Sequence, residues 1–350
     1  MGACVWAHGT QAGAHLAPQI RLGVDFAHGK KKDVTFIRGA SLRKAGVRAG
    51  FENVMVGVVK KKEKKKATRW HQRNFITEVL IPSLFARKSG AEHRPMFPKL
   101  RAGQIALTWI GHASFLIQTP QHNILVDPNW ANWLVVIKRL KRAGLAINDL
   151  PDIDLVLITH AHFDHLNRRT LRAIAARQPI VVPSGVTNLV HDLGFEKVHE
   201  MNWWDEWTYR DLKITFTPAK HWGARVLHDR HRGYGGFVIE YEGRQVYHCG
   251  DSAYFSGFRE IGRRLAPEIS LLPIGAYEPP SFRDVHMGPE QAVQAFHELK
   301  SKMFVPMHFG TYRLSYEPMH EPAQRLMLAG NKAGCLQNIR FLVEGMPQVF

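Results

Sequence analysis

The sequence predicts an α/β protein in which two β-sheets pack face to face between outer helices, a four-layer α/β/β/α sandwich. Three observations support this fold class. Short runs rich in β-branched and apolar residues begin near residue 100 and are separated by turn residues. Strand-like runs then alternate with runs of helical spacing. This order, hairpins first and helix–strand alternation afterwards, occurs twice along the chain.

The first half of the pattern predicts a hairpin region followed by buried strands and helices. A continuous apolar run at 154–159 suits a strand that is covered on both faces, and Gly194 is the expected end of a helix. The expected strands are residues 104–111, 114–119, 123–127, 154–159 and 179–184. The expected helices are residues 168–178 and 186–194.

The second half repeats this order. It begins with an alternating strand at 212–219 and a hairpin at 235–251, whose turn lies near Glu242 and Gly243. The remaining expected strands are 269–275 and 303–310, and the expected helices are 258–266, 289–300 and one near 321–330. The tryptophan-rich run at 202–207 is expected to pack at a sheet edge rather than to line a groove for an acyl chain.

The positive charge of the chain is concentrated near its N-terminus. The formal net charge is +17; residues 1–101 hold 21 Lys or Arg against 6 Asp or Glu, whereas the remainder holds 26 against 24. Residues 1–68 show weak periodicity and end in a lysine-rich block, which predicts a flexible basic extension. Such an extension suits contact with an anionic membrane surface. Residues 69–350 are expected to form the folded domain.

Cysteine usage and hydropathy indicate the compartment. The three cysteines are scattered and form no CxxC pair, which argues against a disulfide framework and favours a reducing environment. No apolar run is long enough for a transmembrane helix, and the first residues lack the pattern of a secretory signal. We therefore expect a cytoplasmic protein, with association to a membrane through the basic extension as an additional possibility.

The segment HAHFDH at 160–165 crowds three histidines and an aspartate into six positions directly behind an apolar run. Imidazoles and carboxylates are the ligands that zinc prefers, and iron and manganese accept them as well. His160 and His162 alternate by two and can face one ion. Asp164 and His165 are adjacent, so that a turn can direct both at a second ion. The segment therefore predicts a metal site.

Further candidates stand at the ends of other predicted strands, namely Asp127, His221, Asp251 and His308. Functional groups gather at the carboxyl ends of strands in sheets that are flanked by helices. His221 is expected to complete the first ligand set, His308 the second, and Asp251 to bridge the two ions. Two neighbouring zinc ions can hold a hydroxide between them and clamp the attacked and leaving oxygens.

The motifs ITHAHFDHL, PAKHWGAR, CGDSAYF, PIGAYEP and VHMGPEQAV, in this order, resemble the metallo-β-lactamase superfamily. The resemblance is strongest to its branch of zinc-dependent N-acylphosphatidylethanolamine-hydrolysing phospholipases D, and it covers roughly residues 100–325. It implies the same sandwich fold and the same seven metal ligands. It also implies that His286 contacts the substrate and acts in catalysis together with Asp251, and that Phe163 lies against the substrate.

Two further residues are expected to support the ligands. Metal-bound histidines commonly donate their other N–H to a carboxylate or a carbonyl, which suits Asp127. His112, in the motif GHASFLI, is assigned the same supporting role, and a buried histidine satisfied by backbone groups is the alternative.

The reaction that the resemblance implies is hydrolysis of a phosphodiester by metal-bound hydroxide, with a phospholipid as the substrate. The sequence leaves open a hydrolase of another ester such as a lactone, a nuclease, and a binding protein with an inactive site. Nucleic acid is not expected as a partner, because the basic residues lie outside the catalytic region. The complete ligand set argues against an inactive site.

Overall fold

The computed structural model describes residues 73–226 and 229–350. The predicted basic extension at 1–68 lies outside the described residues, so its boundary and its contact with a membrane stay predictions. Within the described ranges, no helix is both long and apolar enough to cross a bilayer.

As far as the chain is described, the first sheet has seven strands in the order β15-β1-β2-β3-β6-β7-β8. Strands β1, β2 and β3 form an antiparallel meander, and β3, β6, β7 and β8 pair in parallel. The strands are β1 (Ala106–Gly111), β2 (Ser114–Gln118), β3 (Asn123–Val126), β6 (Leu155–Leu157), β7 (Ile180–Pro183), β8 (Val198–Met201) and β15 (Gln348–Val349). The C-terminal strand β15 was not expected from the sequence.

The second sheet of the described part has six strands in the order β14-β13-β12-β11-β10-β9. Its antiparallel part runs from β9 to β12, and β12, β13 and β14 are parallel. The strands are β9 (Glu206–Tyr209), β10 (Leu212–Thr217), β11 (Gly236–Tyr241), β12 (Arg244–His248), β13 (Ile269–Pro273) and β14 (Met303–Met307). The predicted hairpin is present, and positive φ angles at Glu242 (49°) and Gly243 (76°) form its two-residue turn.

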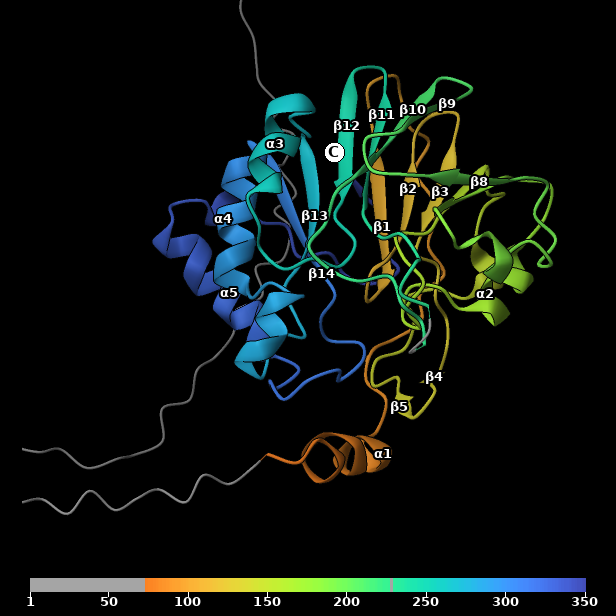
Figure 1. Cartoon of the computed structure of the whole chain (residues 1–350). Helices are drawn as coiled ribbons and strands as arrows, with labels where there is room; N and C mark the ends of the chain where they lie inside the picture. Colours follow the sequence, from red (N-terminus) through yellow and green to blue (C-terminus); the bar gives the residue numbers. More distant parts are fainter. Residues whose placement is uncertain (1–72, 227–228) are drawn as a thin grey trace, which may run out of the picture. The chain divides into compact units, whose positions relative to one another are not determined.

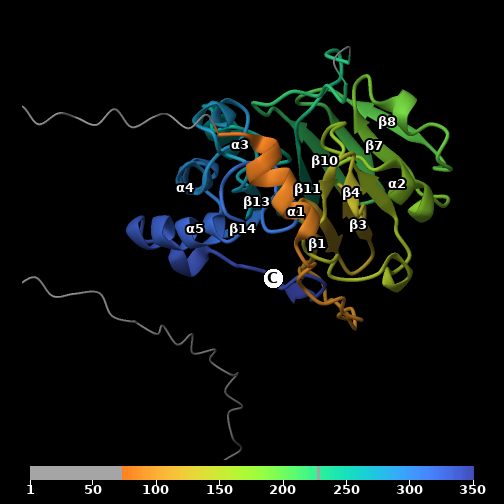
Figure 2. The ribbon, with the colours of Figure 1, turned by 90° about the horizontal axis from the view of Figure 1, so that it is seen from below.

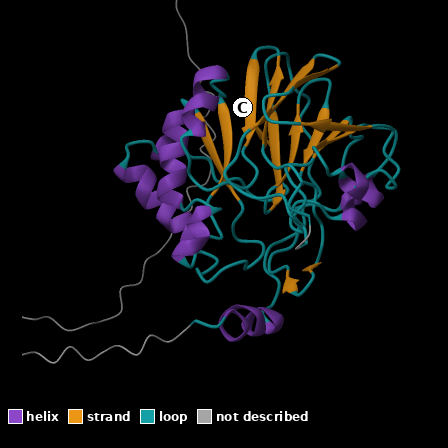
Figure 3. Cartoon of the chain, viewed as in Figure 1, coloured by secondary structure: helices purple, strands orange, loops and turns teal. Residues whose placement is uncertain are grey.

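Helices cover the outer faces of both sheets (Figures 1 and 3). Helix α2 (Arg168–Ile174) lies outside the first sheet. Helices α3 (Gly257–Arg264), α4 (Pro289–Leu299) and α5 (Glu321–Lys332) lie outside the second sheet. The predicted α/β/β/α sandwich is thus confirmed. The short helical turns are η2 (Ile147–Asp149), η3 (Thr187–Leu189), η4 (Pro280–Asp284) and η5 (Leu336–Asn338).

One predicted helix is wrong. Residues 186–194 contain only the single 3₁₀ turn η3. The carboxylate of Glu200, on β8, accepts hydrogen bonds from the backbone N–H groups of Gly185 and Thr187, both at 3.1 Å. The side chain of Asn188 accepts a bond from Arg232 at 2.6 Å. These tertiary contacts fix a tight turn where the local residues, Thr and Asn, have little helix preference.

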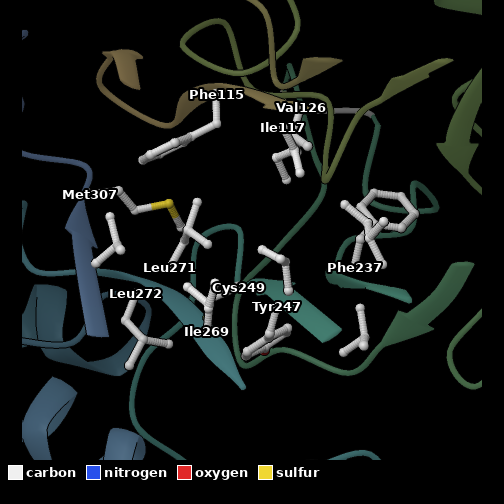
Figure 4. Packing of buried hydrophobic residues seen from close by; sticks show 14 of the residues in the cluster. Phe115, Ile117, Val126, Phe237, Tyr247, Cys249, Ile269, Leu271, Leu272 and Met307 are labelled. Atoms are coloured by element: carbon white, nitrogen blue, oxygen red, sulfur yellow. The ribbon is translucent and has the colours of Figure 1, made fainter. Parts of the chain in front are cut away.

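The core follows the two-residue period of the strands. In β2, Phe115 and Ile117 point into the core between the two sheets, whereas Leu116 joins the cluster that packs against α2. Figure 4 shows Phe115 and Ile117 of the first sheet facing Phe237 and Leu271 of the second. Because both faces of the first sheet are covered, its strands read in the sequence as continuous apolar runs.

A small substructure lies beside the sandwich at the end where β13 and β14 finish (Figures 1 and 2). It consists of η1 (Ile76–Leu80), α1 (Ile81–Phe85) and the hairpin β4 (Trp133–Leu134) and β5 (Ile137–Lys138). The Lys138 ammonium donates to the carbonyls of Leu84 at 2.8 Å and Ala86 at 2.9 Å. The ring of Phe75 packs edge-on against Tyr316, in the loop after β14, at 5.8 Å. These contacts hold the helical segment near the loops that follow the strands.

Candidate metal centre

The candidates that the sequence placed at strand ends do follow strands. They are Asp127 after β3, His160 after β6, His221 after β10, Asp251 after β12 and His308 after β14. All five side chains are buried. Parallel pairing of β3 with β6, and of β12 with β13 and β14, brings the carboxyl ends of these strands to one end of each sheet. The two sheets thus present His and Asp side chains to the same space.

The loop that carries HAHFDH is held in a tight turn. The N–H of Leu166 donates to the carbonyl of His162 at 2.8 Å, which closes one turn. The side-chain amide of Asn129 donates to the carbonyls of Phe163 at 3.2 Å and Asp164 at 2.8 Å. Asn129 therefore ties this loop to the segment after β3, a role that the sequence did not reveal.

Arg225 clamps the same loop from the opposite side. Its guanidinium donates to the carbonyls of Ala161 at 2.7 Å and Leu166 at 2.8 Å, and it lies 4.0 Å from the centre of the Phe163 ring. Burial lowers the pKa of Arg225 to about 10, so the group is still a cation at neutral pH. The available signal in the sequence was its place in the motif HWGAR, four residues after His221.

Three imidazole nitrogens converge as the first ligand set: Nε2 of His160, Nδ1 of His162 and Nε2 of His221. The His162 nitrogen lies 2.9 Å from that of His160 and 3.2 Å from that of His221. Ligands of a tetrahedral zinc ion at ordinary Zn–N distances stand roughly 3.4 Å from one another. The separations in this set are close to that value, so the three rings can share one ion.

The second ligand set consists of Asp164, His165 and His308. The Oδ2 atom of Asp164 lies 3.7 Å from Nε2 of His165 and 3.4 Å from Nε2 of His308. All three ligand atoms lie within 4.8 Å of one another, as do those of the first set. The sequence assigned the same three residues to one ion.

Asp251 lies between the two sets. Its Oδ2 atom is 3.8 Å from Nε2 of His160 and 3.9 Å from Nε2 of His221. The same atom is 3.2 Å from Nε2 of His165 and 3.1 Å from Nε2 of His308. A single carboxylate thus faces imidazole nitrogens of both sets, and its role as a bridging ligand stays a prediction.

Several buried ligand atoms lack a hydrogen-bond partner within the described part of the protein. They are Nε2 of His165, Nε2 of His308 and Oδ1 of Asp251. Buried polar atoms in native structures are nearly always paired, so an unpaired group of this kind needs an explanation. Metal coordination satisfies these atoms, and the donor set fits a transition-metal ion of the zinc type.

The electrostatics of Asp251 and of the first ligand set suit metal binding. Burial alone would raise the pKa of Asp251, but the nearby imidazoles of His165 and His308 outweigh burial and hold that pKa well below its usual range. In the first set, burial lowers the pKa of His160 and of His221 well below the ordinary value. The carboxylate is therefore ionised and these imidazoles are neutral at neutral pH, as metal ligands must be.

Asp127 supports the second set. Its Oδ2 atom accepts from Nδ1 of His165 at 2.6 Å, which leaves Nε2 of that ring to face Asp251. Asp127 is in turn fixed by Thr159, whose backbone N–H donates to Oδ1 at 2.7 Å and whose hydroxyl donates to Oδ2 at 2.6 Å. The supporting role expected for Asp127 stays a prediction that these contacts favour.

The other supports use a carbonyl and a second histidine. Nδ1 of His221 donates to the carbonyl of Val285 at 2.9 Å, which directs Nε2 toward the first ligand set. Nε2 of His112 lies 2.9 Å from Oδ2 of Asp164. Burial lowers the pKa of His112 to about 3, so its ring is neutral and donates from this nitrogen. His112 thus contacts Asp164 directly, and its supporting role stays a prediction.

Three of these residues have left-handed backbone angles, with φ of 56° at His112, 45° at Asp127 and 59° at His308. This region is unfavourable for residues with a side chain and is commonest at functional sites. Gly250, with φ of 63°, precedes Asp251, and a Cβ there would lie 2.5 Å from the carbonyl oxygen of Gly235. The backbone of the site is therefore shaped at some cost in strain.

His286 lies at the edge of the centre. Its Nδ1 atom is 3.8 Å from Oδ2 of Asp251 and has no hydrogen-bond partner among the described residues. Burial lowers the pKa of His286 to about 4, so its ring is neutral at neutral pH. The ring of Phe163 is only partly buried and is occupied by the Arg225 guanidinium. The substrate contacts expected of His286 and Phe163 stay predictions.

The tryptophan-rich run divides into packed and exposed residues. Trp207 stacks on His199 at 4.8 Å, and Trp204 lies under the guanidinium of Arg264 at 4.2 Å, so both pack as expected. Trp203 is 44% exposed and lines a cavity. The expectation of simple packing therefore does not describe Trp203.

Comparison with known proteins identifies the family. The model of the "Beta-lactamase superfamily domain" matches residues 122–309, more than half of the chain. The chain is 34% identical over 216 residues to a UPF0173 metal-dependent hydrolase of Rubrobacter xylanophilus, an alignment that spans 60% of this chain and 84% of that protein. Both findings agree with the geometry of the site.

Other relatives are more distant or longer. An uncharacterized protein of Mycobacterium tuberculosis is 32% identical over 241 residues, which is 65% of this chain and 64% of that protein. The chain therefore aligns with less than two thirds of that relative's length. The N-acyl-phosphatidylethanolamine-hydrolyzing phospholipase D 1 of Caenorhabditis elegans is 26% identical over 324 residues, 82% of this chain and 90% of that protein.

A solved structure supports the fold. Igni18, described as a novel metallo hydrolase from the archaeon Ignicoccus hospitalis, superposes with a TM-score of 0.55 at 26% identity and covers 71% of this chain and 98% of its own. The paired sheets, the clustered His and Asp ligands and the family match all lead to one assignment. The chain belongs to the β-lactamase superfamily, and the relatives that match it include a protein named metal-dependent hydrolase.

Proposed function

We propose that the chain hydrolyses a phosphodiester bond of a phospholipid such as N-acylphosphatidylethanolamine, with two divalent ions held by the first and second ligand sets. The observation that carries the proposal is the position of Asp251, whose Oδ2 lies 3.1–3.9 Å from imidazole nitrogens of both sets. A carboxylate shared in this way suits two ions close together. Two such ions can stabilise both the attacking and the leaving oxygen of a displacement at phosphorus.

The choice of a phospholipid draws on the relatives. The Caenorhabditis elegans relative and a relative from Saccharomyces cerevisiae, 27% identical over 243 residues, both carry the name N-acyl-phosphatidylethanolamine-hydrolyzing phospholipase D. The motifs HWGAR, PIGAYEP and VHMGPEQAV suggested this branch, and the last of them contains His286. Lactones and nucleic acids are the competing substrates that a direct test must include.

Zinc is the first choice of metal, because the first ligand set is made of imidazoles alone. Iron and manganese accept the same donors. When bound, the two ions supply Lewis acidity and lower the pKa of water to near 7.

The protein's own residues supply orientation and proton handling. Asp251 offsets the charge of two cations, and Asp127 and Val285 fix the rings of His165 and His221 so that each presents one nitrogen. His286 is neutral and buried, with Nδ1 unpaired among the described residues. That nitrogen can bond to the phosphate or exchange a proton with the departing alkoxide.

Peripheral contact with a membrane is part of the proposal. The basic extension at 1–68 lies outside the described residues, but the described part offers a second feature. Side chains on η1, α1 and the β4–β5 hairpin are exposed: Ile76 58%, Ile81 45%, Leu84 44%, Phe85 83%, Val135 70% and Val136 58%. Lys88 and Lys138 lie beside them, and an apolar surface with a basic border suits an anionic bilayer.

Metal analysis followed by a substrate panel tests the function. We expect about two divalent ions per chain and turnover of phosphodiesters, most of all a phospholipid, that is lost with a chelator and restored by zinc. The panel includes a lactone and single-stranded and double-stranded DNA. A single tightly held ion contradicts the dinuclear assignment, and preferred turnover of the lactone or of DNA contradicts the substrate class.

Cosedimentation with vesicles tests the membrane contact. Full-length protein, a variant lacking residues 1–68 and the variant Phe85→Ser are compared at low and high salt with vesicles rich in phosphatidylserine. Loss of the extension should weaken binding mainly at low salt, because screening removes the attraction of exposed charges. Phe85→Ser should weaken binding at both salt concentrations. Equal binding by all three proteins would mean that neither feature contacts the bilayer.

A further inference from the structure

Two spaces open beside the first ligand set and share one residue, Tyr234. The larger, about 720 Å³, is lined by Trp222, Gly223, Ala224, Arg225, Val226, Arg230 and Tyr234. The smaller, about 310 Å³, is lined by Met201, Asn202, Trp203, Phe216, Gly233 and Tyr234. Their sizes lie in the range of pockets for small molecules. We name the surface formed by Trp222, Tyr234 and Trp203 the aromatic groove.

The aromatic groove begins at the metal ligands. Trp222 follows His221 directly, and its indole stacks on the His221 ring at 4.7 Å and meets the His162 ring edge-on at 5.1 Å. The Tyr234 ring lies 6.4 Å from His221 and 5.5 Å from Trp203. The groove therefore begins directly beside the first ligand set, and two arginines border its larger space.

The aromatic rings of the groove are exposed yet held in place. Trp222 and Trp203 are each 44% exposed, although large aromatic side chains are usually well covered. The indole N–H of Trp203 donates to the carbonyl of Tyr234. A Cβ added to Gly223 would lie 2.1 Å from the carbonyl oxygen of Arg232, so the two segments that carry Trp222 and Tyr234 are in close contact. Exposed apolar rings on a fixed backbone are typical of a binding site.

We propose that the aromatic groove binds one fatty acyl chain of the substrate whose phosphate lies at the metal centre; this proposal rests on the proposed function. Chains of methylene groups gain free energy from contact with aromatic rings through burial of apolar surface. Two neighbouring spaces that share Tyr234 as a lining residue suit an extended chain better than a compact group.

The shape and charge of the groove favour a lipid chain over a nucleobase. Trp203 and Tyr234 meet at 83°, so together they form a trough and not the parallel platform on which a base stacks. No acidic residue is among those that line the two spaces. Arg225 and Arg230 border the larger space, which suits an anionic head group at the end nearer the metal ligands.

Binding of single-chain alkyl phosphates to the full-length protein tests the groove without turnover. Dodecyl phosphate and butyl phosphate, below the concentration at which micelles form, are titrated by calorimetry into the wild type and into Trp203→Ala, Trp203→Phe and Tyr234→Ala. Trp207→Ala serves as the control, because Trp207 packs on Tyr209 at 5.3 Å and does not line either space. Circular dichroism and thermal unfolding verify that each variant folds.

The inference predicts that Trp203→Ala and Tyr234→Ala weaken dodecyl phosphate binding about tenfold, as expected from lost aromatic contact. Butyl phosphate should be affected much less, Trp203→Phe should retain most of the affinity, and Trp207→Ala should equal the wild type. The proposal is overturned if all variants bind dodecyl phosphate with the affinity of the wild type. It is also overturned if Trp207→Ala loses as much affinity as Trp203→Ala. If adenosine monophosphate binds more tightly than dodecyl phosphate and its binding depends on Trp203, the groove binds a nucleotide and not a lipid chain.

The same proteins separate this inference from the proposed function. If the wild type binds dodecyl phosphate through Trp203 but hydrolyses no phosphodiester, the proposed function is wrong and the proposal that the groove binds an acyl chain is retained. A second outcome is that the wild type hydrolyses phosphodiesters with the same ratio of kcat/KM for long-chain over short-chain substrates as Trp203→Ala. In that case only the acyl-chain proposal is wrong, and the proposed function is retained.

Discussion

The two ligand sets of the metal centre differ in charge and in the groups behind them. The first set is three imidazoles, and its supports are uncharged, such as the carbonyl of Val285 behind His221. The second set contains the carboxylate of Asp164, and an ionisable side chain, Asp127, lies behind His165 at 2.6 Å. With Asp251 shared, one ion would face a single carboxylate and the other two.

This difference indicates unequal sites. More carboxylate charge attracts a divalent cation more strongly and suits harder ions such as manganese, whereas the imidazole set favours zinc. We therefore expect the two ions to be bound with different affinities. The following predictions test this comparison, from the largest expected effect to the smallest.

Asp251→Ala should have the largest effect, because it should impair metal binding by both ligand sets. The variant removes the carboxylate that both sets share, so both ions lose their bridging charge. We expect loss of most bound metal by elemental analysis and a fall in turnover of about 10³-fold or more, given that the ions contribute several kcal/mol. Asp205→Ala, which changes an exposed carboxylate, is the control. Two retained ions in Asp251→Ala would contradict the bridging role.

His286→Ala should separate catalysis from metal binding. The variant keeps both ligand sets, so its metal content should equal that of the wild type. Turnover should fall on the order of 10²- to 10⁴-fold, the usual range for a lost proton donor or acceptor. His297→Ala, on the exposed side of α4, provides the control. Lost metal in His286→Ala would make this residue a ligand, and unchanged turnover would remove it from the mechanism.

The metal-free protein should lose stability as the pH falls from about 6.5 to about 4. Burial lowers the pKa of His286 to about 4 in the folded chain, whereas the unfolded chain keeps the ordinary value of 6.5. Between these values the unfolded chain binds more protons, so acid favours unfolding. A pKa that falls this far corresponds to on the order of 3 kcal/mol.

Urea unfolding of the chelated protein across this pH range measures the effect. The variant His286→Asn should show a smaller loss of unfolding free energy between pH 6.5 and pH 4 than the wild type. Parallel curves for the two proteins would mean that His286 is not the buried neutral group described.

Asp127→Asn should affect the two ions unequally. It weakens the direct support of His165, whereas it reaches the first ligand set indirectly, through the Thr159 hydroxyl, which lies 3.0 Å from Nδ1 of His160. Loss of such a supporting carboxylate typically costs 10- to 100-fold in metal affinity, or about 1.4–2.7 kcal/mol. Competition with a chelator should show one ion released more easily and the other held as before, with Asp149→Asn as the control. Equal weakening of both ions would mean that the two sets act as one unit.

Much of this site could be predicted from the sequence, because its ligands follow strands. Buried strands appear as apolar runs, and the polar residue that ends each run is conspicuous. Asp127 after 123–126 and His308 after 303–307 were found in this way. The supporting contact of Asp127 with His165 spans 38 residues, but both partners belong to types that support or bind metals.

The clamps of the metal loop could not be predicted in this way. Asn129 and Arg225 bind backbone carbonyls that are 34 to 64 residues away, and a carbonyl has no sequence signature. The exposure of Trp203 depends on how the segment after β8 meets Tyr234, which only the folded chain decides. The false helix at 186–194 has the same origin, since Glu200 and Arg232 act there across the fold.

The left-handed backbone at His112, Asp127 and His308 has a consequence for protein engineering. A residue with a side chain in this region costs roughly 1–2 kcal/mol relative to the right-handed form, a cost that glycine does not have. Glycine at these positions would remove the backbone cost, but it would also remove a buried side chain and, at Asp127, its hydrogen bonds to Thr159 and His165. Relief of the strained backbone and loss of the side chain that the site needs therefore come together at each of these positions, so an engineer cannot gain the first without the second.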